Sequence, residues 1–234
     1  MEDSLLKIQR QVIACARCPR LVKYRCQVAE QKKRAYRDWD YWGKPVPGFG
    51  DPKARLLVIG LAPAAHGGNR TGRVFTGDSS GDLLFQTLHR TGFANQDRSV
   101  SRDDGLQLQA AYVTAAVRCA PPANKPLPVE FRNCRPYLER ELALLRSVRV
   151  VVALGKIAFD SYLAILRDIV QNRGLILSSN PYRFYHGATY TFPAPLPALI
   201  ASYHPSRQNT NTGKLTPAMF LGIFKRAKLL LAKV

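Results

Sequence analysis

The sequence lacks any apolar run long enough to cross a bilayer, and its first residues, MEDSLLKIQRQ, lack the apolar core of a secretory signal peptide. We therefore expect a cytoplasmic protein, nucleoid-associated in a prokaryote, with no membrane partner. Internal repeats, low-complexity tracts and a domain boundary are also missing from the pattern. We predict one domain over residues 1–234.

Acidic residues are scarce. The chain has 35 Lys and Arg against 16 Asp and Glu, a net charge of +19, and no acidic residue from Ile169 to the end. This asymmetry favours a polyanionic partner, although a solvated basic surface has the same composition. No GxxxxGKS, GxxxxGKT or GxGxxG motif is present, so a small-molecule phosphate-binding enzyme is the least favoured alternative.

Apolar runs alternate with helical patterns along the chain. We predict an α/β fold, a three-layer α/β/α arrangement with a short parallel central sheet, because each run reads as a strand buried on both faces. The expected strands are residues 56–61, 112–117, 148–154 and 199–202. The expected helices are residues 4–13, 20–35, 81–90, 128–145 with a break near Pro136, 156–170 and 216–233. Residues 36–53 and 206–213 are expected to be loops, and 182–192 a hairpin or an insertion.

The most informative stretch is residues 60–82, GLAPAAHGGNRTGRVFTGDSSGD, between a predicted strand and a predicted helix. Ligands of open α/β sheets bind where such strands end, and a long connection in a compact domain is usually functional. Glycines allow the backbone to approach a ligand closely.

The five cysteines form the second pattern. Cys15 and Cys18 make a C-x-x-C, while Cys119 and Cys134 flank a proline-rich loop, and we expect Cys26 in the core. Four spaced thiolates in a cytosolic protein suit zinc or an iron–sulfur cluster, and the spacing alone leaves both open. A C-x-x-C redox pair with buried free thiols elsewhere is the less favoured alternative.

The GLAPAAHGGNRTGRVFTGD stretch resembles the first motif of the family-5 uracil-DNA glycosylases, and residues 203–206, YHPS, resemble the second. The resemblance runs from about Cys15 to Ser206. It implies a monofunctional enzyme that flips uracil, or other deaminated bases such as hypoxanthine and xanthine, out of DNA and hydrolyses the N-glycosidic bond. It also implies a [4Fe–4S] cluster bound by Cys15, Cys18, Cys119 and Cys134. We expect a monomer that acts on DNA.

Three residues are the catalytic candidates. Asp78 is the acid of the loop nearest the helix start, so it suits stabilisation of the sugar cation or positioning of water, although an N-cap role explains it equally well. His204 is a candidate donor to the departing base, and Asn124 in the proline-rich loop is a candidate reader of the base edge or a simple turn residue. No lysine stands out as a Schiff-base nucleophile, so we expect water to attack.

The remaining candidates are a base pocket and a set of phosphate contacts. For the pocket we expect Phe75, Ala64, His66 and Asn69. For DNA phosphates we expect Arg70, Arg73, Ser206, Arg207 and Lys214, each of which also reads as a solvated surface residue.

Two rival functions stay open at this point. Residues 62–65, APAA, lack the acid expected of a family-4 enzyme, which argues against that type. A non-catalytic iron–sulfur nucleic-acid-binding module would bind DNA without releasing a base.

Overall fold

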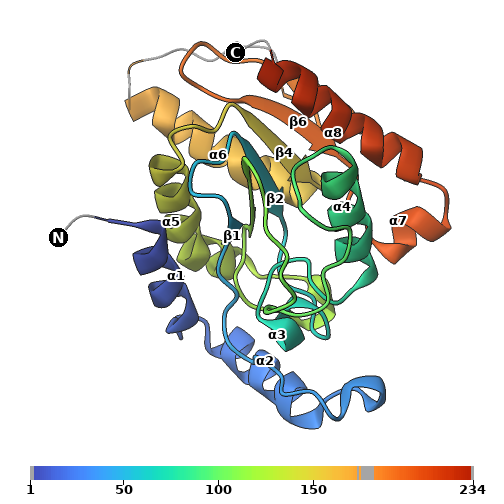
Figure 1. Cartoon of the computed structure of the whole chain (residues 1–234). Helices are drawn as coiled ribbons and strands as arrows, with labels where there is room; N and C mark the ends of the chain where they lie inside the picture. Colours follow the sequence, from blue (N-terminus) through green and yellow to red (C-terminus); the bar gives the residue numbers. More distant parts are fainter. Residues whose placement is uncertain (1–2, 173, 175–181, 233–234) are drawn as a thin grey trace.

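The computed structural model describes residues 3–172, 174 and 182–232 (Figure 1). The helices are α1 (Leu5–Ile13), α2 (Pro19–Gln31), α3 (Gly68–Thr71), α4 (Ser79–Arg90), α5 (Pro128–Leu144), α6 (Lys156–Asn172), α7 (Arg207–Asn211) and α8 (Pro217–Ala232). Two 3-10 turns are η1 (Arg34–Tyr36) and η2 (Pro122–Asn124). The strands are β1 (Phe49–Gly50), β2 (Leu56–Gly60), β3 (Ala111–Ala115), β4 (Val150–Leu154), β5 (Thr189–Tyr190) and β6 (Ala198–Ser202).

The sheet has the order β1-β3-β2-β4-β6-β5. Its four central strands are parallel, as expected. At the two edges of the sheet, β1 and β5 pair antiparallel to their neighbours. These edge strands have two residues each and lie outside the long apolar runs, so the sequence pattern did not mark them as strands. Very short edge strands present few unpaired backbone groups to another sheet.

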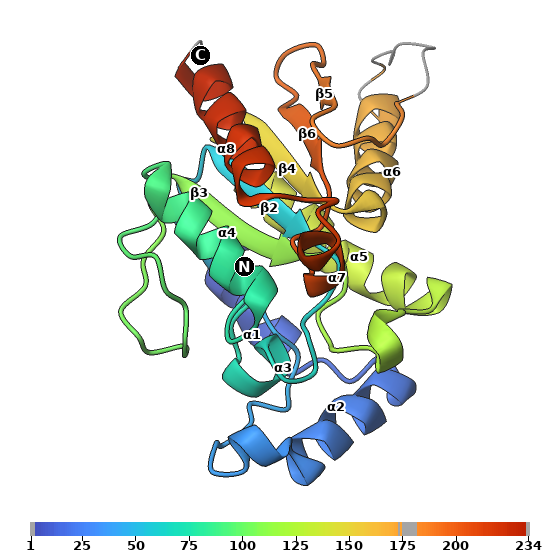
Figure 2. The same ribbon diagram turned by 90° about the vertical axis from the view of Figure 1, so that its right-hand side faces the viewer.

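Alternate side chains of the central strands supply two separate cores, because successive residues of a strand point to opposite faces. Leu56 and Val58 of β2 lie in one core with buried residues of α4 and α8. Leu57 and Ile59 lie in the other core with buried residues of α5 and α6. Figure 2 shows the sheet between these two helix pairs, so the predicted three-layer arrangement is confirmed.

Three local expectations are corrected by the structure. Helix α5 continues through Pro136, because the loss of one backbone hydrogen bond is tolerated in a helix whose flanks are buried. Residues 207–211 form α7, whose first turn is capped by the Ser206 side chain, where a loop was expected. Cys26 is exposed on α2 and does not belong to the core. The expected end of the last helix, Lys233, lies outside the described residues.

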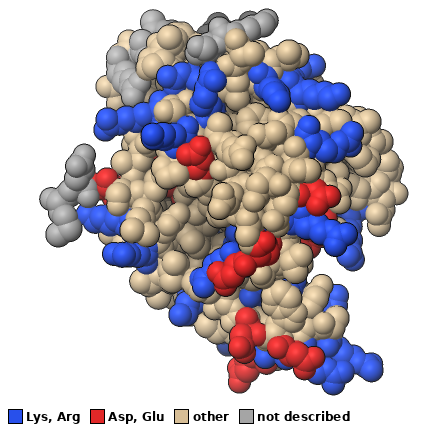
Figure 3. All heavy atoms as spheres, viewed as in Figure 1, with Lys and Arg blue, Asp and Glu red and all other residues tan. Residues whose placement is uncertain are grey.

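The surface keeps the basic bias of the composition. Figure 3 shows Lys and Arg side chains spread over the face seen in Figure 1, with fewer acidic side chains between them. Among the described helices, none is both long and apolar enough to span a membrane.

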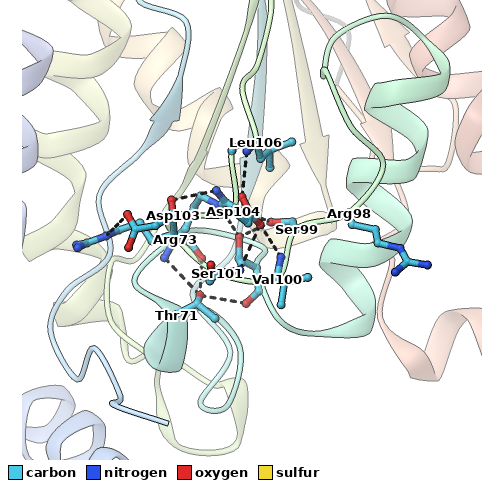
Figure 4. A network of polar contacts seen from close by, with 12 residues as sticks. Thr71, Arg73, Arg98, Ser99, Val100, Ser101, Asp103, Asp104 and Leu106 are labelled. Atoms are coloured by element: carbon cyan, nitrogen blue, oxygen red, sulfur yellow. Dashed lines mark hydrogen bonds and ion pairs between the residues drawn. The ribbon is translucent and has the colours of Figure 1, made fainter.

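A buried ion pair fastens the glycine-rich loop to the segment that precedes β3 (Figure 4). Arg73 donates to the carboxylate of Asp104 at 2.6 Å and to Ser99 Oγ at 2.8 Å. Asp104 also accepts from the backbone N–H groups of Val100 and Leu106. Burial by itself raises the pKa of Asp104, but the hydrogen bonds from Arg73 and the backbone outweigh it and lower the pKa to about 2.

We expect Asp104→Asn to lower the free energy of unfolding by about 2 kcal/mol at pH 7, because the folded state holds the ionised carboxylate more tightly than the unfolded state. The pKa of Asp104 lies below its unfolded value of 3.8, so this stabilisation is present above that pH and is lost as the pH falls towards 2. Urea unfolding of both proteins between pH 7 and pH 2 measures the difference. Asp103→Asn is the matched control, because its side chain is 88% exposed. A difference that does not shrink on acidification would contradict this account.

Candidate active site

A cavity of about 350 Å³ is lined by residues at the carboxyl ends of the parallel strands and by residues of α7 and its cap. Figure 2 shows α7 at this end of the sheet. This is the edge at which open α/β sheets bind ligands. Its lining consists of Leu61, Ala62, Pro63, Ala64, Val74, Phe75, Asp78, Ser80, Ala115, Ala123, Asn124, His204, Ser206 and Gln208. The walls are therefore mainly apolar, with a few polar side chains converging on the interior, as in small-molecule sites generally. We call it the central pocket.

Phe75 forms one wall because two glycines allow the backbone to close around it. A Cβ on Gly60 would lie 2.5 Å from the Phe75 ring, and a Cβ on Gly81 would lie 1.7 Å from the Phe75 carbonyl oxygen. Only glycine fits at either position. Phe75 itself has a φ of 51°, in the left-handed region that a bulky residue rarely adopts. The packing of β2 and α4 against Phe75 thus sustains a strained backbone at the pocket.

Asp78 is both a helix cap and a pocket residue, so the two readings of this acid are compatible. Its Oδ1 accepts from the backbone N–H groups of Ser80 and Gly81 at 3.0 and 3.1 Å. Its Oδ2 has no hydrogen-bond donor among the described residues. A Cβ on Gly67 would lie 2.2 Å from Oδ2, so a glycine there leaves room for the carboxylate. One oxygen is fixed by the helix, and the other remains available to a ligand or a water.

His204 also lines the pocket, two residues after the end of β6. The rings of His204 and Phe75 stack with centroids 6.0 Å apart and an interplanar angle of 29°. Burial lowers the pKa of His204 below its ordinary value of 6.5, and the charge of Asp78 opposes this effect without cancelling it. At neutral pH the imidazole is therefore mostly uncharged, with one ring nitrogen as donor and the other as acceptor.

Asn124 reaches the pocket from the proline-rich loop after β3. Ala123 and Asn124 both have left-handed backbones, with φ of 51° and 55°. Arg20 braces this loop by donating to both carboxylate oxygens of Glu130, at 2.8 and 2.7 Å, and to the Lys125 carbonyl at 3.1 Å. The Asn124 amide has no side-chain hydrogen bond within the described part of the chain, so it is free to pair with a ligand.

With this geometry established, the chain can be compared with known proteins. The model of the uracil DNA glycosylase superfamily matches residues 47–228. The chain belongs to this superfamily. It is 54% identical over 220 residues to the type-5 uracil-DNA glycosylase of Thermus thermophilus, covering 93% of this chain and 94% of that protein. It is 47% identical over 228 residues to the type-5 enzyme of Mycobacterium leprae, covering 97% of this chain and 96% of that protein.

The similarity also separates two branches of the superfamily. The type-4 uracil-DNA glycosylase of Sulfurisphaera tokodaii is 28% identical over 209 residues, covering 87% of this chain and 78% of that protein. This is well below the identity to type-5 proteins. The resemblance to the type-5 branch is confirmed, and the type-4 alternative is set aside.

Two residues that the sequence assigned to the surface are instead buried inside the protein. Arg70 and Arg73 are only 4% and 3% exposed, so the predicted phosphate contacts are wrong. Arg70 donates to the carbonyl oxygens of His66 and Gly77, and Arg73 pairs with Asp104. The sequence pattern gave no sign of these partners, which are loop carbonyls for Arg70 and a carboxylate for Arg73.

The predicted pocket residues divide in the same way. Phe75 and Ala64 line the central pocket. Asn69 does not, because it is 1% exposed and donates to the backbone carbonyl of Arg25. His66 also lies outside the pocket. It lines a neighbouring groove, where its Nδ1 lies 2.9 Å from the Tyr41 hydroxyl, and burial lowers its pKa.

The three remaining DNA-contact candidates differ in position, because Arg207 and Lys214 line neighbouring depressions and not the central pocket. Ser206 lines the pocket and caps α7. Arg207 is exposed and donates to Ser79 Oγ at 3.1 Å. Lys214 is exposed, 4.9 Å from the centroid of the Tyr203 ring. Gln208 also lines the pocket, and the sequence did not single it out. The sequence feature that could have identified Gln208 is Ser206, whose side chain caps the helix over residues 207–211.

Four of the five cysteines converge on one small cavity behind the proline-rich loop. Its cysteine lining is Cys15, Cys18, Cys119 and Cys134. Burial, opposed by the charge of Arg25, raises the pKa of Cys119 to about 12. Burial likewise raises the pKa of Cys134 to about 11, against the effect of Arg118. In residues 3–172, 174 and 182–232, no three His, Cys, Asp or Glu side chains are arranged to hold a metal ion. The cluster therefore remains a prediction.

The surroundings of this cavity nevertheless fit an anionic group. Asn133 Nδ2 lies 3.4 Å from Cys18 Sγ. The Nε atoms of Arg25 and Arg118 are buried and have no hydrogen-bond partner in the part of the chain that the structure describes. Arg118 is held by a bidentate ion pair with Glu141 inside the protein, at 3.1 and 2.7 Å. Buried cations and orphaned donors next to four thiols suit a site for a thiolate-ligated cluster.

The pKa of His204 can be tested directly. We expect a value below 6.5 in the folded protein, and a still lower value in Asp78→Asn, because the charge of Asp78 raises the pKa of the imidazole. NMR titration of the His ring signals, with His204→Gln to assign the resonance, measures both. An unchanged or higher pKa in Asp78→Asn would show that the carboxylate does not act on this imidazole.

Proposed function

We propose that this protein removes uracil from DNA by hydrolysing the N-glycosidic bond, leaving an abasic site. The observation that carries the proposal is a set of three polar groups that line the central pocket with Phe75 and have no hydrogen-bond partner among the described residues. These are Asp78 Oδ2, the Asn124 amide and the His204 ring. The relatives named type-5 uracil-DNA glycosylases support the substrate. We extend the proposal to other deaminated bases, hypoxanthine and xanthine.

The pocket suits an extruded base because it combines a flat apolar wall with a side chain that can form hydrogen bonds to the edge of the base. A glycosylase rotates its target nucleotide out of the stack and recognises the base by stacking and by hydrogen bonds to its edge. Phe75 offers the stacking surface. The Asn124 amide offers one acceptor and two donors, which complement the alternating carbonyl and N–H groups of uracil.

His204 acts on the departing base. Cleavage of the bond leaves negative charge on the base, and a hydrogen-bond donor held in a pocket stabilises that charge. A mostly uncharged imidazole donates from one nitrogen without placing a full positive charge in an apolar cavity. Its stack on Phe75 sets the orientation of the ring relative to the base.

Asp78 acts on the sugar side. The sugar gains positive charge as the bond breaks, and a nearby carboxylate stabilises that charge or orients the attacking water. The bonds from Ser80 and Gly81 fix Oδ1, so Oδ2 is presented in one position. Residues 62–64, which also line the pocket, have no polar side chain, so Asp78 is the acid of this wall.

We expect the purified protein to release uracil from a uracil-containing duplex, and Asp78→Asn to slow release between about a hundredfold and ten-thousandfold. Asn caps helices as well as Asp does, so this substitution removes the charge and keeps the cap. His204→Ala and Asn124→Ala are expected to slow release about a hundredfold each. Strand nicking after alkali measures abasic-site formation.

The control is Asp82→Asn, which removes an exposed acid one helical turn after Asp78 that does not line the pocket. Its rate should match the wild type. Wild-type release with undiminished Asp78→Asn would remove Asp78 from the mechanism. DNA binding without release of any deaminated base would favour a non-catalytic binding module.

We also propose that Cys15, Cys18, Cys119 and Cys134 bind a [4Fe–4S] cluster. The shared cavity, the Asn133 contact and the orphaned arginine nitrogens support this assignment. When bound, the cluster supplies four iron–thiolate bonds that cross-link the N-terminal segment to the loop after β3 and to α5. Arg20 lies two residues after the proposed ligand Cys18. It donates to the backbone carbonyl of Lys125, so it braces the loop that carries Asn124.

Protein purified without oxygen should contain about four iron and four sulfide per chain. Cys119→Ser should lose most of this iron and should unfold at a lower temperature. Cys26→Ser is the matched control, because Cys26 is exposed and outside the cavity, and it should retain the iron. Elemental analysis and thermal unfolding measure both effects. Finding zinc and no sulfide in the purified protein would show that the four cysteines bind zinc and not an iron–sulfur cluster.

A further inference from the structure

A second depression runs from the central pocket towards the N-terminal segment. Its lining is Tyr24, Lys33, Tyr36, Ala64, Ala65, His66, Gly67, Gly77, Asp78, Ser79, Ser80, Pro121, Ala123, Asn124 and Arg207. We call it the flanking groove. It shares Ala64, Asp78, Ser80, Ala123 and Asn124 with the central pocket, so the two spaces meet where the sugar of an extruded nucleotide would lie.

The outer wall of the groove comes from α2 and the turn after it. Figure 1 shows α2 beyond the end of the sheet, next to α3, and the two helices pack together. Arg70 holds this wall in place, because its guanidinium lies 4.0 Å from the ring centroids of both Tyr36 and Trp39. The same guanidinium donates hydrogen bonds to the backbone carbonyl oxygens of His66 and Gly77, two separate points of the glycine-rich loop. The groove wall and the loop that carries Asp78 are thus one connected structure.

The groove carries uncompensated positive charge. Lys33 and Arg207 are exposed, and neither has a carboxylate within 4.0 Å among the described residues. Asp78 is the only acid in the lining, and it faces the shared end. Lys33 comes from the segment after α2 and Arg207 from α7, so the groove offers a phosphate two exposed cations from different elements.

The groove also offers an aromatic surface. Tyr24 is half-buried, and within the described residues its ring has no aromatic or cationic partner. Tyr36 differs, because Arg70 already covers it. An aromatic ring beside unpaired cations is the arrangement that binds single-stranded nucleic acid, where bases stack on rings and phosphates contact the cations.

We propose that the flanking groove is a binding site for the nucleotide adjacent to the extruded one, with its phosphate on Lys33 and Arg207 and its base on Tyr24. The inference rests on the proposed uracil release, and it adds a second nucleotide subsite to the single one in the central pocket. In single-stranded DNA the neighbouring base is free to stack on Tyr24, whereas a neighbouring base that stays paired in a duplex is not, so this subsite adds to the binding of single strands.

The test compares substrate changes with enzyme changes. The substrates are a single-stranded uracil oligonucleotide and two versions in which the base immediately 5′ or 3′ of the uridine is replaced by an abasic spacer. The enzymes are wild type, Tyr24→Leu and Lys33→Met. Lys23→Met is the matched control, because Lys23 is exposed on the same helix and does not line the groove.

We expect one of the two spacers to lower kcat/KM of the wild type about tenfold, through KM and not through kcat, because stacking binds ground state and transition state alike. The same spacer should have little further effect in Tyr24→Leu. A further substrate carries a neutral methylphosphonate in place of the phosphate on that side. It should lower kcat/KM of the wild type and of Lys23→Met, and it should have little further effect in Lys33→Met.

Equal effects of both spacers in wild type and Tyr24→Leu would overturn the proposal. The comparison does not depend on turnover, because fluorescence anisotropy of Asp78→Asn, with and without Tyr24→Leu, measures the same coupling in binding. If the spacer and Tyr24→Leu are coupled in binding but the wild type releases no uracil, the groove proposal stands and the proposed reaction is refuted. Thermal unfolding of each variant checks that the fold is intact.

Discussion

The close approach of the glycine-rich loop to the end of β2 is the constraint on which the site depends. Phe75 is pressed between the backbone of Gly60 and the first turn of α4, at distances that leave no room for a Cβ. This packing sets the position of α4, and the first turn of α4 fixes Asp78. It also sets the ring against which His204 stacks. One sterically defined wall therefore places a carboxylate and an imidazole on the same pocket.

A second set of contacts ties the N-terminal segment to that pocket. Arg70 connects two points of the loop to the aromatic residues of the segment after α2. Arg20 connects the start of α2 to the loop that carries Asn124. The four converging cysteines lie between the same elements. Binding a cluster there would rigidify the strained backbone at Ala123 and Asn124, so the cysteines can influence the pocket without touching a substrate.

The charge of the protein is distributed unevenly with respect to function. The net charge is +19, yet Arg70 and Arg73 of the glycine-rich loop are buried and bond groups inside the protein. The pocket itself has an uncharged imidazole and one carboxylate, which suits a reaction that separates charge between sugar and base. Exposed cations such as Lys33 and Arg207 surround it, where phosphates of a polyanion would pass. The surface attracts the substrate, and the interior acts on it.

The sequence by itself determined the layer arrangement and the edge of the sheet where the site lies, because the apolar runs and the helix caps are local signals. Asp78, His204 and Asn124 were identifiable because each directly follows a predicted strand or lies in the loop beyond it. The fates of Arg70, Arg73 and Asn69 were decided only by the tertiary structure. Their partners, the aromatic rings of residues 36 and 39, Asp104 and the carbonyl of Arg25, come from segments whose contact no local pattern encodes. Whether an arginine is exposed to solvent or pairs with a buried carboxylate depends on long-range packing, which neither composition nor local sequence pattern encodes.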